Sequence, residues 1–93
     1  MLKQFTLAQA KRTKRDRFLI ISAMLSHAVR GVYKTELMYK VGLSFSQVEA
    51  YLQLLLESEL MEVSISKRKF VYSTTEKGKS FLCTFDTLFG FLA

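Results

Sequence analysis

The stretch from Thr35 to Thr75 constrains the fold more than any other part of this 93-residue chain. It reads as a short helix, a break at residues 41–43, a longer helix that begins at Ser44, and two short strands. The loop between the strands contains three consecutive cations, at residues 67–69. A tight helix–turn–helix followed by a β-ribbon with a cationic tip is expected to present a helix end and a basic loop on one side of a small body, spaced to straddle a nucleic-acid groove.

Helical spacing of apolar residues predicts a first helix from about Asp16 to Arg30. Its apolar face is so broad that we expect this helix to be largely enclosed, with His27 as a structural histidine. The second helix is expected to have Thr35 as its N-cap and to stop at Gly42, because glycine tolerates the positive φ of an abrupt helix end.

The third helix is predicted to be capped by Ser44, because Gln47 stands three residues later and completes a capping box. Its apolar residues share one broad arc, and the opposite face is small and polar near the N-terminus. The expected inward positions are Phe45, Val48, Tyr51, Leu52, Leu55 and Leu56, and the expected outward positions are Ser46, Gln47, Ala50, Gln53, Leu54 and Glu57.

Two β-strands are predicted to follow, because apolar and polar residues alternate at about 61–66 and 70–73. The loop between them contains no glycine, so we expect a relaxed connection of three to five residues rather than a tight primed turn. From Thr75 the pattern is helical again and carries an apolar stripe. That stripe comprises Phe81, Leu82, Phe85, Leu88, Phe89 and Leu92.

Together these elements predict a single domain over residues 1–93 that is mainly α with a small β-hairpin. In this α+β fold, a winged helix-turn-helix is preceded by a basic arm at 1–14 and followed by an additional C-terminal helix at 76–92. The absence of proline and the presence of only four glycines agree with mostly regular structure, and 49% hydrophobic residues suffice for one core.

The distribution of charge says more than the formal net charge of +6. Residues 1–34 carry a net charge of +7, residues 35–63 carry −4 and residues 64–93 carry +3. Two basic regions that flank an acidic one suggest a polyanion held at two places. The alternative is that these charges only solvate the surface of a small protein.

Several classes of function are disfavoured by the sequence. The longest apolar patch, at 81–93, is too short to cross a membrane and is interrupted by Asp86, so we read the protein as intracellular. Neither Cys83 nor His27, the single cysteine and histidine, has partners in the sequence for a metal site, a disulfide within the chain or catalysis. We therefore expect no enzyme activity, metal, cofactor or small-molecule ligand.

Four segments carry a resemblance to a known family: Leu37-Met38-Tyr39-Lys40, Leu43-Ser44-Phe45-Ser46, Tyr51-Leu52 with Leu55, and Thr75-Glu76-Lys77-Gly78-Lys79. The stretch from about Arg30 to Leu82 resembles the small archaeal winged-helix DNA-binding proteins, including the ten-kilodalton chromatin-associated proteins of Sulfolobus. The length and terminal helix are also similar to the winged-helix proteins of turreted icosahedral viruses of Sulfolobus. The resemblance implies a homodimer, built through the last helix, that binds double-stranded DNA with the helix at 44–57. In one departure, that helix contains Glu49 and Glu57 but no arginine or lysine to read guanine.

The candidate groove contacts are small or polar residues of the third helix: Ser44, Ser46, Gln47, Ala50 and Gln53. Glutamine can pair with adenine, serine can donate or accept, and alanine permits close approach or meets a thymine methyl. Alternatively, Ser44 and Gln47 only cap the helix. Each good base contact supplies about 1–3 kcal/mol of discrimination, so we expect modest sequence specificity.

Affinity is expected to come from phosphate contacts instead. The three cations of the hairpin loop, Lys67, Arg68 and Lys69, are the leading candidates. Lys34 and Thr35, at the start of the second helix, are a second set, because free backbone N–H groups there attract an anion. A third set lies in the basic arm or an exposed first turn and comprises Lys11, Arg12, Lys14, Arg15 and Arg17. The alternative is that this arm only confers solubility.

The terminal helix has more aromatic surface than a peripheral helix of a small domain needs, so part of it is expected to form a homodimer interface. The predicted interface residues are Phe81, Phe85, Leu88, Phe89 and Leu92. Cys83 lies roughly opposite the centre of this stripe and would meet its symmetry mate if a two-fold axis passed there. An intersubunit Cys83 disulfide would suit the archaeal setting that the resemblance implies, and a free, half-buried thiol is the alternative.

Two other functions remain open at this stage. A winged helix can serve protein–protein contact, with the acidic third helix and an exposed Leu54 meeting a basic partner. A membrane-surface role through the basic arm is the other. Retention on heparin or duplex DNA with steep salt dependence favours DNA binding, and capture of a partner that is insensitive to salt favours the first alternative.

Overall fold

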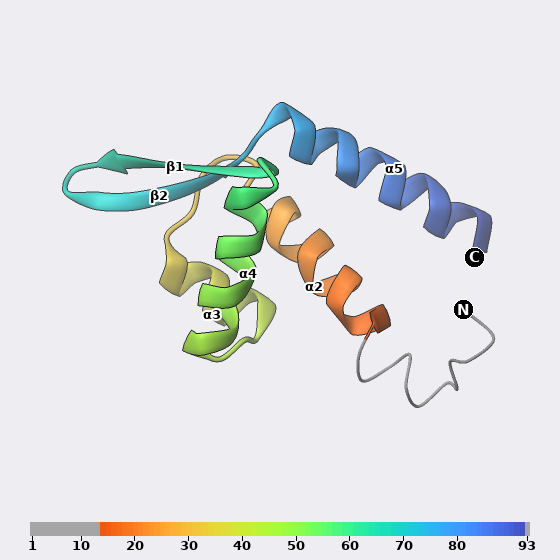
Figure 1. Cartoon of the computed structure of the whole chain (residues 1–93), viewed down its shortest axis with the longest axis horizontal. Coiled ribbons are helices and arrows are strands. Elements are labelled where there is room, and N and C mark those ends of the chain that lie inside the picture. The colour runs from red at the N-terminus through yellow and green to blue at the C-terminus, as the bar shows by residue number, and fades with distance from the viewer. Residues whose placement is uncertain (1–13, 93) are drawn as a thin grey trace.

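Residues 14–92 are described by a computed structural model, in which a two-stranded antiparallel hairpin projects from a group of four helices (Figure 1). The elements are α2 (Lys14–His27), α3 (Lys34–Val41), α4 (Phe45–Glu57), β1 (Met61–Ser66), β2 (Lys69–Thr74) and α5 (Glu76–Leu92). The predicted α+β winged-helix arrangement is confirmed. The predicted arm lies outside the described residues except for Lys14, and the side chains of Lys14, Arg15, Phe89 and Leu92 lie outside them as well.

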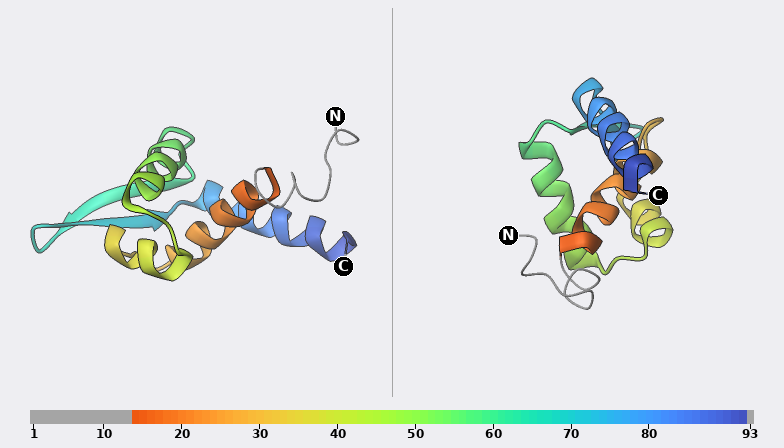
Figure 2. Two further views of the ribbon diagram at one scale, coloured as in Figure 1. Left: turned by 90° about the horizontal axis from the view of Figure 1, so that it is seen from below. Right: turned by 90° about the vertical axis from the view of Figure 1, so that its right-hand side faces the viewer.

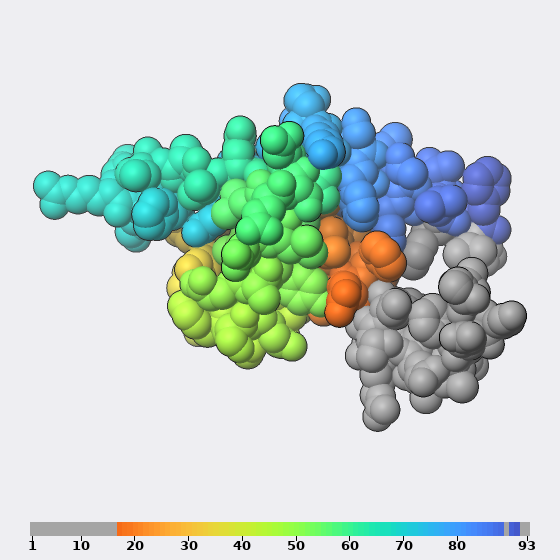
Figure 3. Space-filling view, viewed as in Figure 1, coloured from red at the N-terminus to blue at the C-terminus, as the bar shows by residue number. Residues whose placement is uncertain are grey.

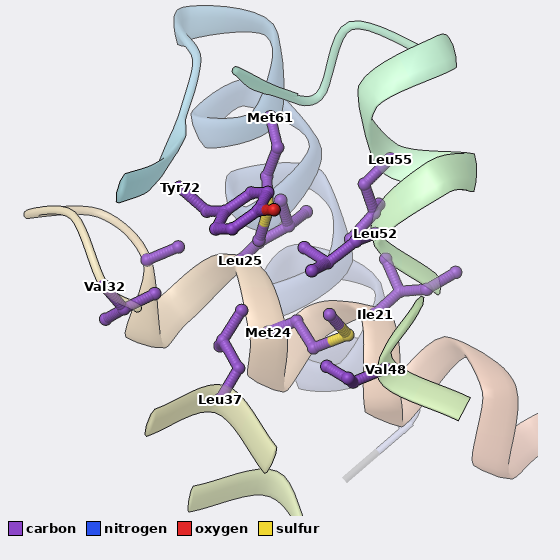
Figure 4. Packing of buried hydrophobic residues seen from close by; sticks show 11 residues of the cluster. Ile21, Met24, Leu25, Val32, Leu37, Val48, Leu52, Leu55, Met61 and Tyr72 are labelled. Atoms are coloured by element: carbon purple, nitrogen blue, oxygen red, sulfur yellow. The ribbon is translucent and has the colours of Figure 1, made fainter. Parts of the chain in front are cut away.

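One hydrophobic core lies where α2, α3, α4 and the base of the hairpin meet (Figure 4). Among the described side chains, every element except α5 contributes a buried apolar residue, and α5 covers the core with partly buried Phe81 and Leu82. The buried residues are Ile21, Met24, Leu25, Ala28, Val32, Leu37, Val48, Leu52, Leu55, Met61 and Tyr72. Val48, Leu52 and Leu55 of α4 face this core, so the polar side of α4 is turned to solvent, as the helical spacing predicts.

The caps of α3 and α4 fix where the two helices start. Ser44 caps α4 as predicted, since its hydroxyl accepts from the Gln47 N–H at 3.2 Å and its own N–H donates to Gln47 Oε1 at 2.9 Å. The prediction for α3 is wrong by two residues: Tyr33 is the N-cap, and its N–H donates to Glu36 Oε1 at 2.9 Å. Glu36 lies three residues after Tyr33, so its carboxylate can accept from the N-cap N–H even though Tyr33 is not a typical capping residue. Thr35 therefore lies within the first turn of α3.

The hairpin loop has two residues, which corrects the expectation of a relaxed three- to five-residue connection. The strands pair from Met61 opposite Thr74 to Ser66 opposite Lys69, so only Lys67 and Arg68 remain between them. Both adopt positive φ, 53° and 68°, as a type I′ turn requires. That turn matches the twist of the strands, although a side chain in the left-handed region costs about 1–2 kcal/mol per residue.

The base of the hairpin is tied to the end of α2. Val32 pairs with Tyr72 through two backbone hydrogen bonds of 2.9 and 2.8 Å, which adds a one-residue bridge beside β2. The buried hydroxyl of Thr74 donates to the Leu25 carbonyl at 2.6 Å, and the Thr74 N–H donates to the Ala28 carbonyl at 3.0 Å. These contacts fix the direction in which the hairpin leaves the body.

The Thr75–Lys79 segment is a structural joint between α4, the hairpin and α5. The Thr75 hydroxyl caps α5 by accepting from the Gly78 N–H at 3.0 Å, and it donates to the Glu59 carbonyl at 2.6 Å. Gly78 is buried, and a Cβ built there would overlap the Leu60 carbonyl oxygen and lie 2.6 Å from Thr74 Cγ2. The glycine therefore lets the first turn of α5 lie directly on the chain that enters β1.

The hairpin, which we call the wing, and α5 extend in opposite directions from the body, and the described chain spans 48 × 26 × 21 Å (Figure 1). The enclosure predicted for the first helix holds only for its second half, since Phe18 and Leu19 are exposed. His27 was expected to be enclosed with the first helix. It is exposed instead, at the last residue of α2. Within residues 14–92, no helix is both long enough and apolar enough to span a bilayer.

Replacing Gly78 with alanine should destabilise the fold by about 1–3 kcal/mol, because the added methyl group meets backbone that cannot rotate away. Gly90→Ala is the matched control, since a Cβ at that position of α5 meets nothing within 4 Å and should leave stability unchanged or raise it. Urea unfolding followed by circular dichroism measures both. Equal stability of the two variants would contradict the packing described for the joint.

Candidate nucleic-acid interface

The outward face of α4 presents small and polar side chains at the positions predicted for groove contacts. Ser46, Gln47, Ala50 and Gln53 are all exposed. The capping box uses the acceptor oxygen of Gln47, and its amide NH₂ group still has donors to offer. Gln53 donates to Glu57 Oε2 at 3.2 Å. This face can therefore donate hydrogen bonds, but it carries no cation.

Ser44 has a structural role in addition to any contact with a ligand. Its hydroxyl accepts from the Gln47 N–H and lies 3.4 Å from the hydroxyl of Ser46. The Ser44 hydroxyl and the Gln47 amide oxygen therefore cap the helix, as the alternative reading holds. A role in DNA binding would use the other polar groups of the same side chains, the Gln47 NH₂ group and the Ser44 O–H.

Lys34, predicted to contact phosphate, is paired within the described chain. Its ammonium group forms an ion pair with the Glu49 carboxylate and lies 5.2 Å from the centroid of the Phe45 ring. The hydrogen bond to Glu49 raises the pKa of Lys34 above its usual value, so the group is charged at neutral pH. The neighbouring Thr35 is exposed and does not take part.

Phe45 is not in the core, contrary to prediction, and its ring belongs to this surface cluster instead. The ring is 58% exposed and lies beside the ammonium group of Lys34 at the N-terminal end of α4. A cation–π contact at an exposed site contributes about 0.5–1 kcal/mol, which offsets only part of the stabilisation that burial of the ring would give. Sequence spacing alone could not find this cluster, because its cation comes from α3, 15 residues before Glu49.

The tip of the wing carries two exposed cations that project away from the body. Figure 3 shows the end of the wing standing clear of the other described elements. Within the described part of the chain, neither Lys67 nor Arg68 has an ion pair or hydrogen bond. Lys69 differs, because its ammonium group lies 5.0 Å from the centroid of the Tyr33 ring, at the start of α3. The three predicted cations therefore divide into two at the tip and one directed back toward the body.

The wing and α4 meet in a concave angle. A hollow of about 350 Å³, open to solvent, lies between α4, the first residue of α3 and Tyr72 at the root of the wing. Its lining comes from α3, α4 and β2: Lys34, Glu49, Leu52, Gln53, Leu56, Glu57 and Tyr72. The view from below shows α4 beside the root of the wing and α5 leaving in the other direction (Figure 2). Of the predicted groove contacts only Gln53 lines this hollow, and the wing borders it only through Tyr72.

The far end of α5 exposes apolar side chains. Leu88 is exposed, and Phe91, which is not among the predicted interface residues, is 81% exposed. The signal for Phe91 is its position three residues after Leu88, which places the two on one side of a helix. Phe81 and Phe85 are half-buried, and their rings stack with centroids 6.2 Å apart. Cys83 is an exposed free thiol.

Comparison with known proteins agrees with this arrangement. A family model described as winged helix-turn-helix matches residues 14–91. Sso10a-2, a DNA-binding protein from Sulfolobus solfataricus, has a similar fold with a TM-score of 0.70 and 19% identity, over 77% of this chain and 76% of that one. MepR, a transcription regulator of the Staphylococcus aureus multidrug efflux pump MepA, gives 0.73 and 13%, over 91% of this chain and 64% of its own.

A third similar structure is a predicted DNA-binding transcriptional regulator from E. coli, with a TM-score of 0.61 and 18% identity, over 89% of this chain and 99% of that one. At these identities the solved structures establish a shared fold. No curated protein matches the sequence at a significant level.

Proposed function

Because the chain belongs to the winged helix-turn-helix family, we propose that it binds double-stranded DNA as a homodimer and acts as a transcriptional regulator or a nucleoid-type protein. The observation that carries the proposal is the placement of the exposed polar side of α4 beside the root of the wing, whose tip carries two cations with no partner among the described residues. An origin in an archaeon or an archaeal virus is part of the same proposal and is supported by the sequence resemblance.

In this proposal α4 enters the major groove, whose width admits an α-helix. Ser46, Gln47, Ala50 and Gln53 would then face base edges, and Ser44 would lie at the phosphate nearest the helix start. None of these side chains can form the paired contact that arginine makes with guanine, so discrimination between sequences is modest.

Phosphate contacts supply most of the affinity. Lys67 and Arg68 lead, because they have no described partner that a phosphate must displace. Lys34 contributes only as far as it turns from Glu49 to the DNA backbone, since its charge is already balanced. Lys69, Thr35, Lys14 and Arg15 remain predicted contributors.

A protein–protein role is the second candidate, and one observation favours it. Leu54 is exposed on the same side of α4 as the acidic Glu57, which suits a basic partner with an apolar contact. Salt separates the two functions: DNA binding through several phosphates weakens steeply with salt, and an apolar contact does not.

The variant Lys67→Asn/Arg68→Gly tests the wing directly. Asn-Gly suits a type I′ turn, so we expect stability to rise by about 1 kcal/mol while two cations disappear. Affinity for duplex DNA should fall, and the log–log salt slope should become shallower by about 1.8, which corresponds to two phosphate contacts. Gel-shift titrations over a salt series and urea unfolding measure the two effects on one variant.

Lys79→Ala is the control for general charge, because Lys79 lies on α5 and pairs with Glu76. It should leave the salt slope unchanged. If the Asn-Gly variant bound duplex DNA as tightly as the wild type, with the same slope, the wing would have no part in binding.

Glu49→Gln should strengthen binding to duplex DNA of any sequence several-fold. The change removes a carboxylate from α4 and frees the Lys34 ammonium group for a phosphate, so the salt slope should steepen by about 0.9. Glu76→Gln on α5 is the matched control. If Glu49→Gln instead weakened binding to particular sequences only, Glu49 would be reading a cytosine amino group rather than neutralising Lys34.

The proposed homodimer uses α5, where exposed apolar residues continue beyond the body. Analytical ultracentrifugation should find a dimer, and Leu88→Lys/Phe91→Lys should give a folded monomer, because two ammonium groups cannot be buried in an apolar interface. Tyr39→Lys, which changes an exposed aromatic residue of α3, is the control and should remain dimeric. A wild-type protein that stays monomeric at all concentrations would contradict this interface.

An intersubunit Cys83 disulfide is supported by the exposure of the thiol on the same helix. Non-reducing electrophoresis of protein isolated under oxidising conditions should show a dimer band that disappears with a reductant and in Cys83→Ser. A monomer band in both lanes would remove the disulfide without affecting the noncovalent dimer.

A further inference from the structure

The outer edge of β1 presents backbone groups that pair with no other described part of the chain. On β2, Tyr72 exchanges two backbone hydrogen bonds with Val32, so its N–H and C=O groups point away from β1. Residues opposite each other in an antiparallel ladder either bond each other or both direct these groups outward. Val63, opposite Tyr72, and Ile65, two residues further, therefore direct theirs to the free edge of β1. Among residues 14–92, no hydrogen bond reaches that edge at either residue.

This edge lacks the features that usually prevent a strand from pairing with another chain. The strand Met61–Ser66 contains no proline, lysine or arginine, and its register with β2 runs without a bulge. Val63 and Ile65 are 43% and 70% exposed, and both are β-branched residues that favour strands. With Phe70, which is 59% exposed, they form an apolar row on one face of the wing. An exposed apolar edge of this kind is a template for a further strand.

The charges along the wing indicate which strand fits this edge. Acidic side chains stand at the root, where Glu59 shortly precedes β1 and Glu62 lies within it, and both are exposed. Cations stand at the tip, where Lys67 and Arg68 follow the last residue of β1. A strand that is acidic at one end and basic at the other is complementary to a copy of itself that runs in the opposite direction. A parallel copy would place like charges side by side.

We infer that β1 pairs with β1 of a second copy of the chain, antiparallel and about a two-fold axis at Ser64. In this register Val63 lies opposite Ile65 of the second copy, so each such pair exchanges both N–H···O bonds through the outward groups. The apolar rows of the two wings then lie side by side on one face. Glu62 lies opposite Ser66 of the second copy, next to its tip cations. The two tips lie at opposite ends of the paired strands, so their cations do not meet.

This contact is separate from the proposed dimer contact on α5, which extends from the opposite end of the body (Figure 1). Pairing along one six-residue strand buries less than the about 1,200 Å² of a stable interface, so the association is transient and adds to the α5 dimer only at high protein concentration. Copies joined at both places would form a row. The inference goes beyond the proposed function. Its tests contain no DNA, so failure of the proposed function leaves it standing.

Disulfide trapping tests the pairing and its register. In a Cys83→Ser background, Ser64→Cys places a thiol on the two-fold axis, where facing Cα atoms lie about 4.5 Å apart, within the range of a disulfide. Mild oxidation at high protein concentration should give a covalent dimer on a non-reducing gel. Ser66→Cys, exposed on the same face of β1, is the matched control and should react about tenfold more slowly, because it lies opposite Glu62 and not opposite its own copy. Equal rates, or no covalent dimer from either variant, would overturn the inference.

A charge exchange tests the same contact without a cysteine reaction. Glu62→Lys and Lys67→Glu/Arg68→Glu should each lose self-association, because like charges then face each other across the paired strands. A mixture of the two variants should regain it, since the acidic tip of one then lies beside the basic root of the other. The backbone amide signals of Val63 and Ile65 in one ¹⁵N-labelled variant should therefore shift when the other variant is added, and not when more of the same variant is added. Signals that move in neither case, or equally in both, would overturn the inference.

Discussion

The direction of the wing depends on the contacts at the root of the hairpin, above all the hydroxyl of Thr74 on the Leu25 carbonyl and the backbone pair of Val32 with Tyr72. Both contacts are buried, where an unsatisfied hydroxyl or amide costs about 1–3 kcal/mol. Because α4 packs on the same core, they also fix the angle between α4 and the wing. The proposed DNA-binding surface lies within that angle. Its shape therefore depends on these buried contacts and not on the residues that would touch DNA.

Much of this fold could be predicted because its determinants are local. The box of Ser44 and Gln47 reads directly from two residues three apart, and the stop at Gly42 is seen as a φ of 79°. The burial of Val48 and Leu52 follows from helical spacing in the same way. The outward face of α4 was predictable for the same reason, although its role in binding stays a prediction.

Other features could not be predicted, because they depend on contacts between distant segments. The ion pair of Lys34 with Glu49 joins two helices, and sequence spacing does not say that they meet there. The wing turn has no glycine, yet strand pairing leaves only Lys67 and Arg68 to close it, so register outweighs the local cost of positive φ. A binding role would make that cost acceptable, since it places both cations at the outermost point of the wing.

The most direct test of the central claim is a backbone-amide NMR titration of the protein with a short duplex at low salt. The account predicts that the largest shift changes fall on two separate parts of the chain, the outward face of α4 around Ser46 and Gln53 and the wing tip at Lys67 and Arg68. Changes confined to α5, or none at saturating duplex, would contradict it.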